Sequence, residues 1–210
     1  MTLVIASAFG LSLLASVASL AAPSSAAPIS ELMLRSLFVQ ELVVLAILAW
    51  FLRVRGWTVA RVGLDFAPRD LVAALSLWIL VLGTVWFARM AVGTLFGHHS
   101  PLQSAGHLVA RDLTLPTIIV VSCLNAFYEE LFVSGYLINA VKPRRGLWPA
   151  VNASMALRLA YHLYQGGTAV VSILPVGLVF GYWYGRYNRL WPLVLAHVAI
   201  DVVSLASLGR

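Results

Sequence analysis

Long apolar runs separated by short polar loops fill almost the whole chain, and they restrict what it can fold into. A helix rises about 1.5 Å per residue, so about 20 apolar residues cross the roughly 30 Å hydrocarbon core of a bilayer. In lipid, every backbone N–H and C=O must be satisfied within the structure, which an α-helix achieves. The sequence therefore predicts an all-α, polytopic integral membrane helical bundle with six or seven transmembrane helices. The runs cover residues 2–22, 34–52, 71–92, 115–141, 147–165, 168–185 and 190–208.

The composition agrees with a membrane protein and argues against a nucleic-acid partner. Hydrophobic residues make up 61% of the chain and charged residues 10%, whereas a soluble domain has about 25% charged residues. The net charge of +6 comes from Arg and Lys in the short loops, where membrane topology explains them better than a polyanion does. The single cysteine, Cys123, lies in an apolar run. Neither an intramolecular disulfide nor a cysteine-based zinc site is therefore expected.

Positive charge alternates from loop to loop along the chain. The loops 53–70, 142–146 and 186–189 are rich in Arg and Lys, and the loops between them are poor in both. Cytoplasmic loops of membrane proteins carry the excess of positive charge. If all seven runs span the bilayer, the N-terminus lies in the cytoplasm and the C-terminus lies outside.

The first run has two interpretations. Residues 2–22 are uncharged and precede a linker of small residues and proline, 21–28. We expect a first membrane span. A cleaved signal peptide is the alternative, because Ser19-Leu20-Ala21 is small enough for cleavage, although no Lys or Arg precedes the apolar core. The chain is divided into N-terminal membrane helices, 1–112, and a C-terminal helical core, 113–208.

Three further features of the sequence concern a lone carboxylate, two glycines and a group of histidines. Glu41 is a lone carboxylate in the second run, expected near an interface or bonded to a neighbouring helix. Gly177 and Gly181 in the sixth run favour close helix packing. The segment 93–114 is expected to be a solvated loop rather than a metal site, since no carboxylate or cysteine stands at a ligand spacing from its histidines. Those histidines are His98, His99 and His107.

Three pairs of ionisable residues interrupt the later apolar runs. They are Glu129 with Glu130, Arg158 with His162, and His197 with Asp201. An ionised group near the middle of a bilayer costs about 2.5–3.5 kcal/mol on insertion scales, so some interaction must offset it. The second and third pairs each have a spacing of four residues, so each pair shares one helix face. Helix rise places all three pairs at a similar depth. We expect them to converge on one buried polar site.

Carboxylates beside two histidines suit the activation of a water molecule by a general base. If a divalent metal such as Zn²⁺ is bound, His162 and His197 are the expected nitrogen ligands, with Glu129 or Asp201 as an oxygen ligand. The sequence has no His-Glu-x-x-His pattern, so the metal is inferred from residue types alone. A carboxylate pair in a membrane helix, taken by itself, suits a proton or ion relay equally well.

The same residues resemble the motifs of a known family. The CPBP family comprises intramembrane proteases related to the CAAX prenyl protease 2 (Rce1) type and to the Abi bacteriocin-immunity proteins. Its pattern is Glu-Glu-x-x-x-Arg, then Phe-x-x-x-His, then His-x-x-x-Asn/Asp on successive helices. The resemblance covers roughly residues 113–208. The matching segments are Glu129-Glu130 with Gly135-Tyr136, Tyr161-His162-Leu163-Tyr164-Gln165-Gly166, and His197-x-x-x-Asp201 after Leu190-Trp191-Pro192.

The resemblance implies a role for each residue. Glu129 would be the general base, and Glu130 would order the site. His162 and His197 would bind the metal or polarise the scissile carbonyl and its oxyanion, and Asp201 would orient or complete the site. The resemblance also implies a metalloendopeptidase in the plasma membrane of a bacterium, open toward the cytoplasm. Its partners would be the bilayer and a membrane protein or lipidated peptide as substrate.

Two departures from the family pattern matter. Ser134 stands where the pattern has arginine, and Arg158 stands where it has phenylalanine. We expect Arg158 to supply, from the next helix, the positive charge lost at position 134, because an unpaired buried carboxylate is costly. A branch of the family with arginine before Tyr-His-Leu-Tyr-Gln-Gly is similar. Decay of the site is the alternative.

Two other functions fit the same residues. One is a catalytically silent membrane scaffold or regulator of the same family. The other is a proton-coupled transporter, although 210 residues leave little room for the paired repeats of many transporters.

Overall fold

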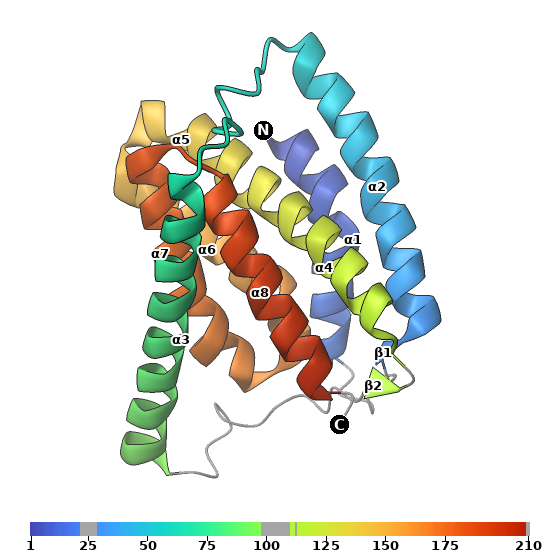
Figure 1. The fold of residues 1–210 in the computed structure, drawn as a ribbon, viewed down its shortest axis with the longest axis vertical. Coiled ribbons are helices and arrows are strands. Elements are labelled where there is room, and N and C mark those ends of the chain that lie inside the picture. The colour runs from blue at the N-terminus through green and yellow to red at the C-terminus, as the bar shows by residue number, and fades with distance from the viewer. Residues whose placement is uncertain (22–28, 98–109, 112, 209–210) are drawn as a thin grey trace.

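Helices dominate the structure (Figure 1). The computed structural model describes residues 1–21, 29–97, 110–111 and 113–208, so His98, His99 and His107 lie outside the described residues. The α-helices are α1 (Thr2–Ala21), α2 (Glu31–Val54), α3 (Arg69–Phe96), α4 (Leu115–Glu129), α5 (Leu137–Arg145), α6 (Leu147–Tyr161), α7 (Gly167–Tyr187) and α8 (Trp191–Leu208). A π-helix, η1 (Glu130–Tyr136), joins α4 to α5, and a 3-10 turn, η2 (Leu163–Gln165), follows α6. The short strand β1 (Ile29–Ser30) pairs in parallel with β2 (Ala110–Arg111).

The predicted all-α membrane bundle is confirmed. Five helical stretches of the described chain are, by length and composition, able to cross a membrane: Thr2–Ser19, Glu31–Val54, Arg69–Phe96, Leu115–Arg145 and Trp191–Leu208. Their outer faces are apolar, as lipid requires. For example, Trp50 on α2 and Phe87 on α3 are each 69% exposed.

The run predicted over 147–165 is shorter as a helix than expected. Helix α6 has 15 residues and ends at Tyr161. The chain then turns through η2 to Gly166, whose φ of 72° is a left-handed value that favours glycine. Neither α6 nor α7 is among the stretches that qualify as a span by length and composition. These two helices pack closely on each other instead.

The contact between α6 and α7 is built on glycine, as the sequence predicted. A Cβ atom placed on Gly177 would lie 3.1 Å from Met155 Cγ, and one placed on Gly181 would lie 3.2 Å from Val151 Cγ1. The glycines are spaced by four residues along α7, and their partners are spaced by four along α6. Such spacing brings two helix backbones together.

We expect Gly177→Leu to destabilise the fold by about 1–3 kcal/mol, because the new side chain overpacks the contact with α6. The measurement is the melting temperature of the purified protein in detergent. Gly83→Leu on α3 is the matched control, since nothing lies within 4 Å of a Cβ atom at Gly83. Equal melting of the two variants would contradict this account of the α6–α7 contact.

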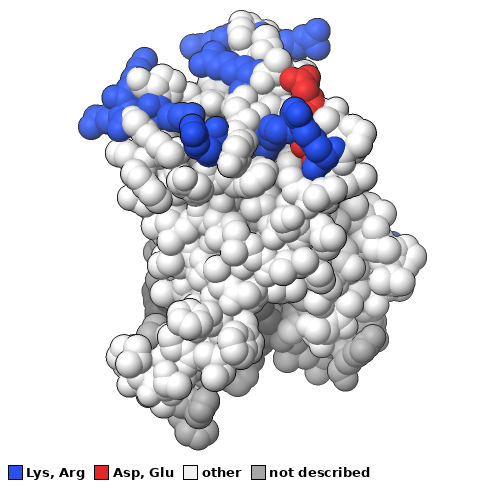
Figure 2. All heavy atoms as spheres, turned by 60° about the vertical axis from the view of Figure 1, so that its left-hand side comes forward, with Lys and Arg blue, Asp and Glu red and all other residues white. Residues whose placement is uncertain are grey.

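Basic side chains gather at one end of the molecule, the end that holds the N-terminus and lies opposite the C-terminus (Figures 1 and 2). The loops 53–70, 142–146 and 186–189 supply exposed Arg and Lys there. Arg189 ties two of these loops together, since it donates to Asp70 at 2.7 and 2.6 Å and to the Asp65 carbonyl at 3.2 Å. This clustering fits the alternation of charge in the sequence.

The opposite end holds the starts of α2 and α4 side by side. The parallel pairing of β1 with β2 precedes both helices. The Glu31 carboxylate then accepts hydrogen bonds from the backbone N–H of Thr114, at 3.3 Å, and from the Thr117 hydroxyl. Helices α2 and α4 therefore begin together and run in the same direction.

Candidate active site

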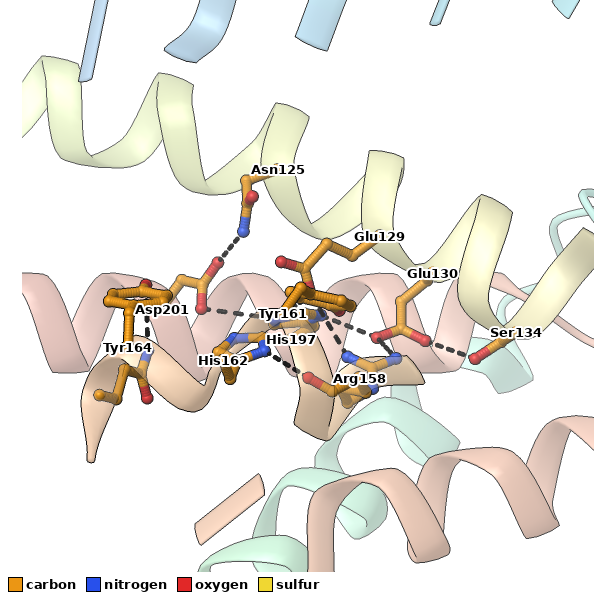
Figure 3. Close-up of polar contacts among 11 residues, drawn as sticks. Asn125, Glu129, Glu130, Ser134, Arg158, Tyr161, His162, Tyr164, His197 and Asp201 are labelled. Carbon is orange, nitrogen blue, oxygen red and sulfur yellow. Dashed lines mark hydrogen bonds and ion pairs between the residues drawn. The ribbon is translucent and has the colours of Figure 1, made fainter. Parts of the chain in front are cut away.

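The chain changes its helical winding where the two adjacent glutamates lie. Glu129 ends α4 and Glu130 begins the π-helix η1. The backbone N–H of Leu137 bonds to the carbonyl of Phe132, five residues earlier. Every residue of η1 is buried. Single-turn π segments are frequent at functional sites, and here the widened turn coincides with two neighbouring carboxylates that both face α6 (Figure 3).

Arg158 of α6 joins the two carboxylates. Its Nη2 lies 2.7 Å from Glu130 Oε1, its Nη1 lies 3.4 Å from Glu129 Oε2, and the residue is 1% exposed. The Ser134 hydroxyl donates to Glu130 Oε2 at 2.7 Å. The structure therefore contains the ion pair predicted for Arg158, with the serine at position 134 hydrogen-bonded to the same carboxylate.

His197 of α8 lies among three carboxylates. Its Nδ1 is 2.8 Å from Glu130 Oε1, and its Nε2 is 3.5 Å from Asp201 Oδ1 and 3.9 Å from Glu129 Oε2. The residue is 6% exposed. Helices α4, η1, α6 and α8 thus bring five of the six predicted site residues into one contact network: Glu129, Glu130, Arg158, His197 and Asp201.

His162 lies beside this network without a hydrogen bond to its carboxylates. Its Nδ1 is 2.9 Å from the carbonyl oxygen of Arg158, and its ring packs 4.5 Å from the ring of Tyr161. Within the described residues, no three His, Cys, Asp or Glu side chains are gathered so that they could hold a metal ion. The predicted ligands His162 and His197 therefore do not form an assembled metal site in this arrangement.

Two residues at the site had no role in the sequence prediction. The Tyr161 hydroxyl donates to Glu129 Oε2 at 2.6 Å, although Tyr161 was noted only as part of a motif. Asn125 donates from Nδ2 to Asp201 Oδ2 at 3.0 Å. Asn125 precedes Glu129 by four residues, so their shared helix face was a signal that could have found it.

Helix α1 supports Tyr161 from the N-terminal part of the chain. The Phe9 ring stacks on the Tyr161 ring, with centroids 4.7 Å apart and planes at 14°. The Ser16 hydroxyl donates to the Tyr161 carbonyl at 2.8 Å. The first apolar run is therefore part of the bundle and touches a residue of the site.

One comparison with known proteins bears on this site. Residues 111–203 match a family model described as Type II CAAX prenyl endopeptidase Rce1-like. The six predicted site residues all fall within this stretch, and the resemblance seen in the motifs is confirmed. No curated protein and no solved structure matches the chain.

Proposed function

We propose that this protein is an intramembrane endopeptidase, because residues 111–203 match the model of a protease family, the Rce1-like endopeptidases. It would hydrolyse peptide bonds of membrane-associated substrates with water activated by Glu129. The observation that carries the proposal is the set of contacts to Glu129. Three polar side chains from two other helices contact one oxygen of its carboxylate, Oε2, and none of them contacts the other oxygen. Those side chains are Tyr161, Arg158 and His197.

Glu129 would act as the general base. All its side-chain contacts within the described residues use Oε2, which accepts from Tyr161 at 2.6 Å and from Arg158 at 3.4 Å. Oε1 is left for a water molecule. Since the residue is 7% exposed, the water would be held in a nearly closed space. A general base needs such a hydrogen bond to the proton it removes.

In the proposed reaction, the water oxygen attacks the scissile carbonyl carbon as Glu129 takes the water proton. The tetrahedral oxyanion would accept a hydrogen bond from Nε2 of His197, which faces the space between Glu129 and Asp201. When the C–N bond breaks, the proton on Glu129 passes to the leaving amine. Preorganised donors of this kind supply a large part of catalysis in acyl transfer.

Glu130 suits an ordering role rather than attack. Oε1 contacts both Arg158 and His197, and Oε2 accepts from Ser134. A carboxylate with both oxygens occupied has no free position for water. Its contact to Nδ1 of His197 holds the imidazole ring, while Asp201 contacts the opposite ring nitrogen.

The divalent metal, Zn²⁺ by donor type, stays a prediction. His162 and His197 would supply nitrogens, with a carboxylate oxygen from Glu129 or Asp201, and the ion would polarise the carbonyl and the water. Three such ligands are not gathered in the described residues, and the proton transfers proposed for Glu129 are written without the ion.

We also propose the location and the substrate class. The substrate would be a membrane protein or a lipidated peptide, and the reaction centre would open toward the basic end of the bundle. By the positive-inside rule that end is cytoplasmic, in the plasma membrane of a bacterium.

The experiment compares new protein N-termini in membranes of cells that express the wild type or Glu129→Gln at equal levels. We expect a set of termini that appears with the wild type and is absent with Glu129→Gln, since glutamine cannot take the water proton. Asp65→Asn is the matched control, because the Asp65 side chain is exposed at the basic end, away from the site network. If no terminus depends on Glu129 while a cellular phenotype persists in both strains, a silent scaffold replaces the enzyme.

A further inference from the structure

Glu41 occupies a position of α2 where the helix pattern calls for an apolar residue. The buried residues of α2 are Leu34, Glu41, Leu48 and Leu52. The first three are spaced by seven residues and form one seam toward the bundle. Glu41 is 5% exposed. A buried carboxyl in this position lowers stability relative to leucine unless it is paired, so packing does not explain it.

Glu41 differs from the other buried carboxyls of the described chain. Glu129, Glu130 and Asp70 each contact an arginine. Glu41 Oε2 has no hydrogen-bond partner among the described residues. The sequence suggested a bond to a neighbouring helix, and the structure shows none there. Such a buried oxygen calls for a donor that the described residues do not supply.

The position of Glu41 along α2 brings it to the level of the candidate active site. Helices α2 and α4 start together and run the same way, so Glu41 and Asn125 both lie about 15 Å from that start. Asn125 bonds to Asp201 of the site. Glu129, Asp201 and His197 are close enough to Glu41 to interact with it electrostatically.

There is also space between α2 and α4, although Glu41 is not among the residues that line it. A pocket of about 420 Å³ lies between α2 and α4, with Phe38 and Val121 in its wall. Phe38 precedes Glu41 by three residues, and Val121 precedes Asn125 by four. The pocket therefore lies about one helical turn from Glu41 and Asn125.

We propose that Glu41 is a substrate-binding residue, whose free oxygen accepts a hydrogen bond from a backbone N–H of the peptide held at Glu129. This inference rests on the proposed endopeptidase function. An extended peptide within a membrane cannot satisfy its own N–H groups, so the protein must supply acceptors. Both oxygens of Glu130 and one oxygen of Glu129 are already occupied. Since Oε1 of Glu129 is reserved for the water, Glu41 supplies a further acceptor, on a helix outside the matched region 111–203.

The test uses two variants in the same comparison of N-termini. Glu41→Leu removes the acceptor, and we expect the Glu129-dependent termini to fall by about ten- to hundredfold. Glu41→Gln keeps a carbonyl acceptor on a side chain of the same length. We therefore expect its yield of Glu129-dependent termini to stay within about threefold of the wild-type yield, a smaller change than the loss of one hydrogen bond causes. The purified Glu41→Leu protein should melt at or above the wild-type temperature, because leucine completes the seam.

Three results would overturn the inference while leaving the protease intact. Glu129-dependent termini that are unchanged in Glu41→Leu would remove Glu41 from the site. A Glu41→Leu protein that melts below wild type would assign Glu41 to the structure. Glu41→Gln as inactive as Glu41→Leu would indicate proton transfer in place of hydrogen-bond acceptance. If no terminus depends on Glu129, the proposed function fails, and this inference fails with it.

A second measurement locates the hydrogen bond on the substrate. Peptides that span a cleavage site found in the comparison are made with one backbone N–H at a time replaced by an ester oxygen. Wild-type protein should lose cleavage efficiency at one position near the scissile bond, and Glu41→Leu should show no further loss at that position. Equal losses in both proteins at every position would contradict the proposal.

Discussion

Replacing Arg158 with alanine is expected to destabilise the folded protein by about 3–5 kcal/mol, the usual cost of removing one partner of a buried ion pair. The guanidinium contacts both Glu129 and Glu130, at 3.4 and 2.7 Å, and it is almost completely buried. Without it, two neighbouring carboxylates remain in a nearly closed site with no cation beside them. The measurements are the melting temperature in detergent and the yield of Glu129-dependent N-termini. Arg145→Ala, at the exposed basic end, is the control and should change neither.

A second substitution tests why Arg158 is needed. Position 134 is one turn from Glu130, and Ser134 already bonds to that carboxylate. An arginine there can reach Glu130 from the same helix, so we expect Ser134→Arg to restore part of the stability and activity of Arg158→Ala. A fully active Arg158→Ala protein would contradict the relocation of the charge and point to a site that does not use it.

Replacing His197 with alanine is expected to reduce cleavage by about 10²–10³-fold, the loss found when one donor to a developing oxyanion is removed. His197 contacts Glu130 through Nδ1 and Asp201 through Nε2, so its imidazole ring lies within the carboxylate network. The yield of Glu129-dependent N-termini measures the effect. Ser207→Ala, exposed on the same helix, is the control. Wild-type yields from His197→Ala would exclude the imidazole from the reaction.

The zinc content of purified wild-type, His197→Ala and Ser207→Ala proteins tests whether a metal is bound. If His197 is a ligand, wild-type protein should retain stoichiometric zinc that is lost in His197→Ala and kept in Ser207→Ala. If His197 acts without an ion, all three samples should be equally poor in zinc while their activities still differ. The two results separate a metal ligand from a hydrogen-bond donor.

The general architecture followed from hydropathy because lipid leaves few alternatives to helices. Hydropathy predicted the ends of the helices less accurately. Residues 161–165 continue the apolar and aromatic pattern of α6, yet the helix ends at Tyr161. The chain turns there because Gly166 takes a left-handed φ, and hydropathy carries no information on backbone angles. The π-helix η1 was not predicted for a similar reason, since its hydrogen bonds depend on tertiary packing.

The ion pair of the candidate site could be predicted because an unpaired buried charge is costly in any fold. Arg158 was the cation in the later apolar runs that could meet Glu130, and it does. Tyr161 was missed because a tyrosine within a membrane helix usually has no chemical role. Its contact with Glu129 depends on how α6 faces α4. From the motifs alone, His162 and His197 had equivalent roles, yet His162 contacts a backbone carbonyl and His197 contacts a carboxylate.

The shortness of α6 has a consequence for how the protein enters the membrane. Its 15 residues extend about 22 Å, less than the hydrocarbon thickness, and one of them is a buried arginine. Such a segment partitions poorly into lipid by itself. Its place in the bilayer depends on the glycine face of α7 and on the carboxylates of α4 and η1. The residues that form the site are therefore also the residues that retain α6 in the membrane. Stable placement of α6 in the bilayer is thus coupled to formation of the ion pairs of Arg158 with Glu129 and Glu130.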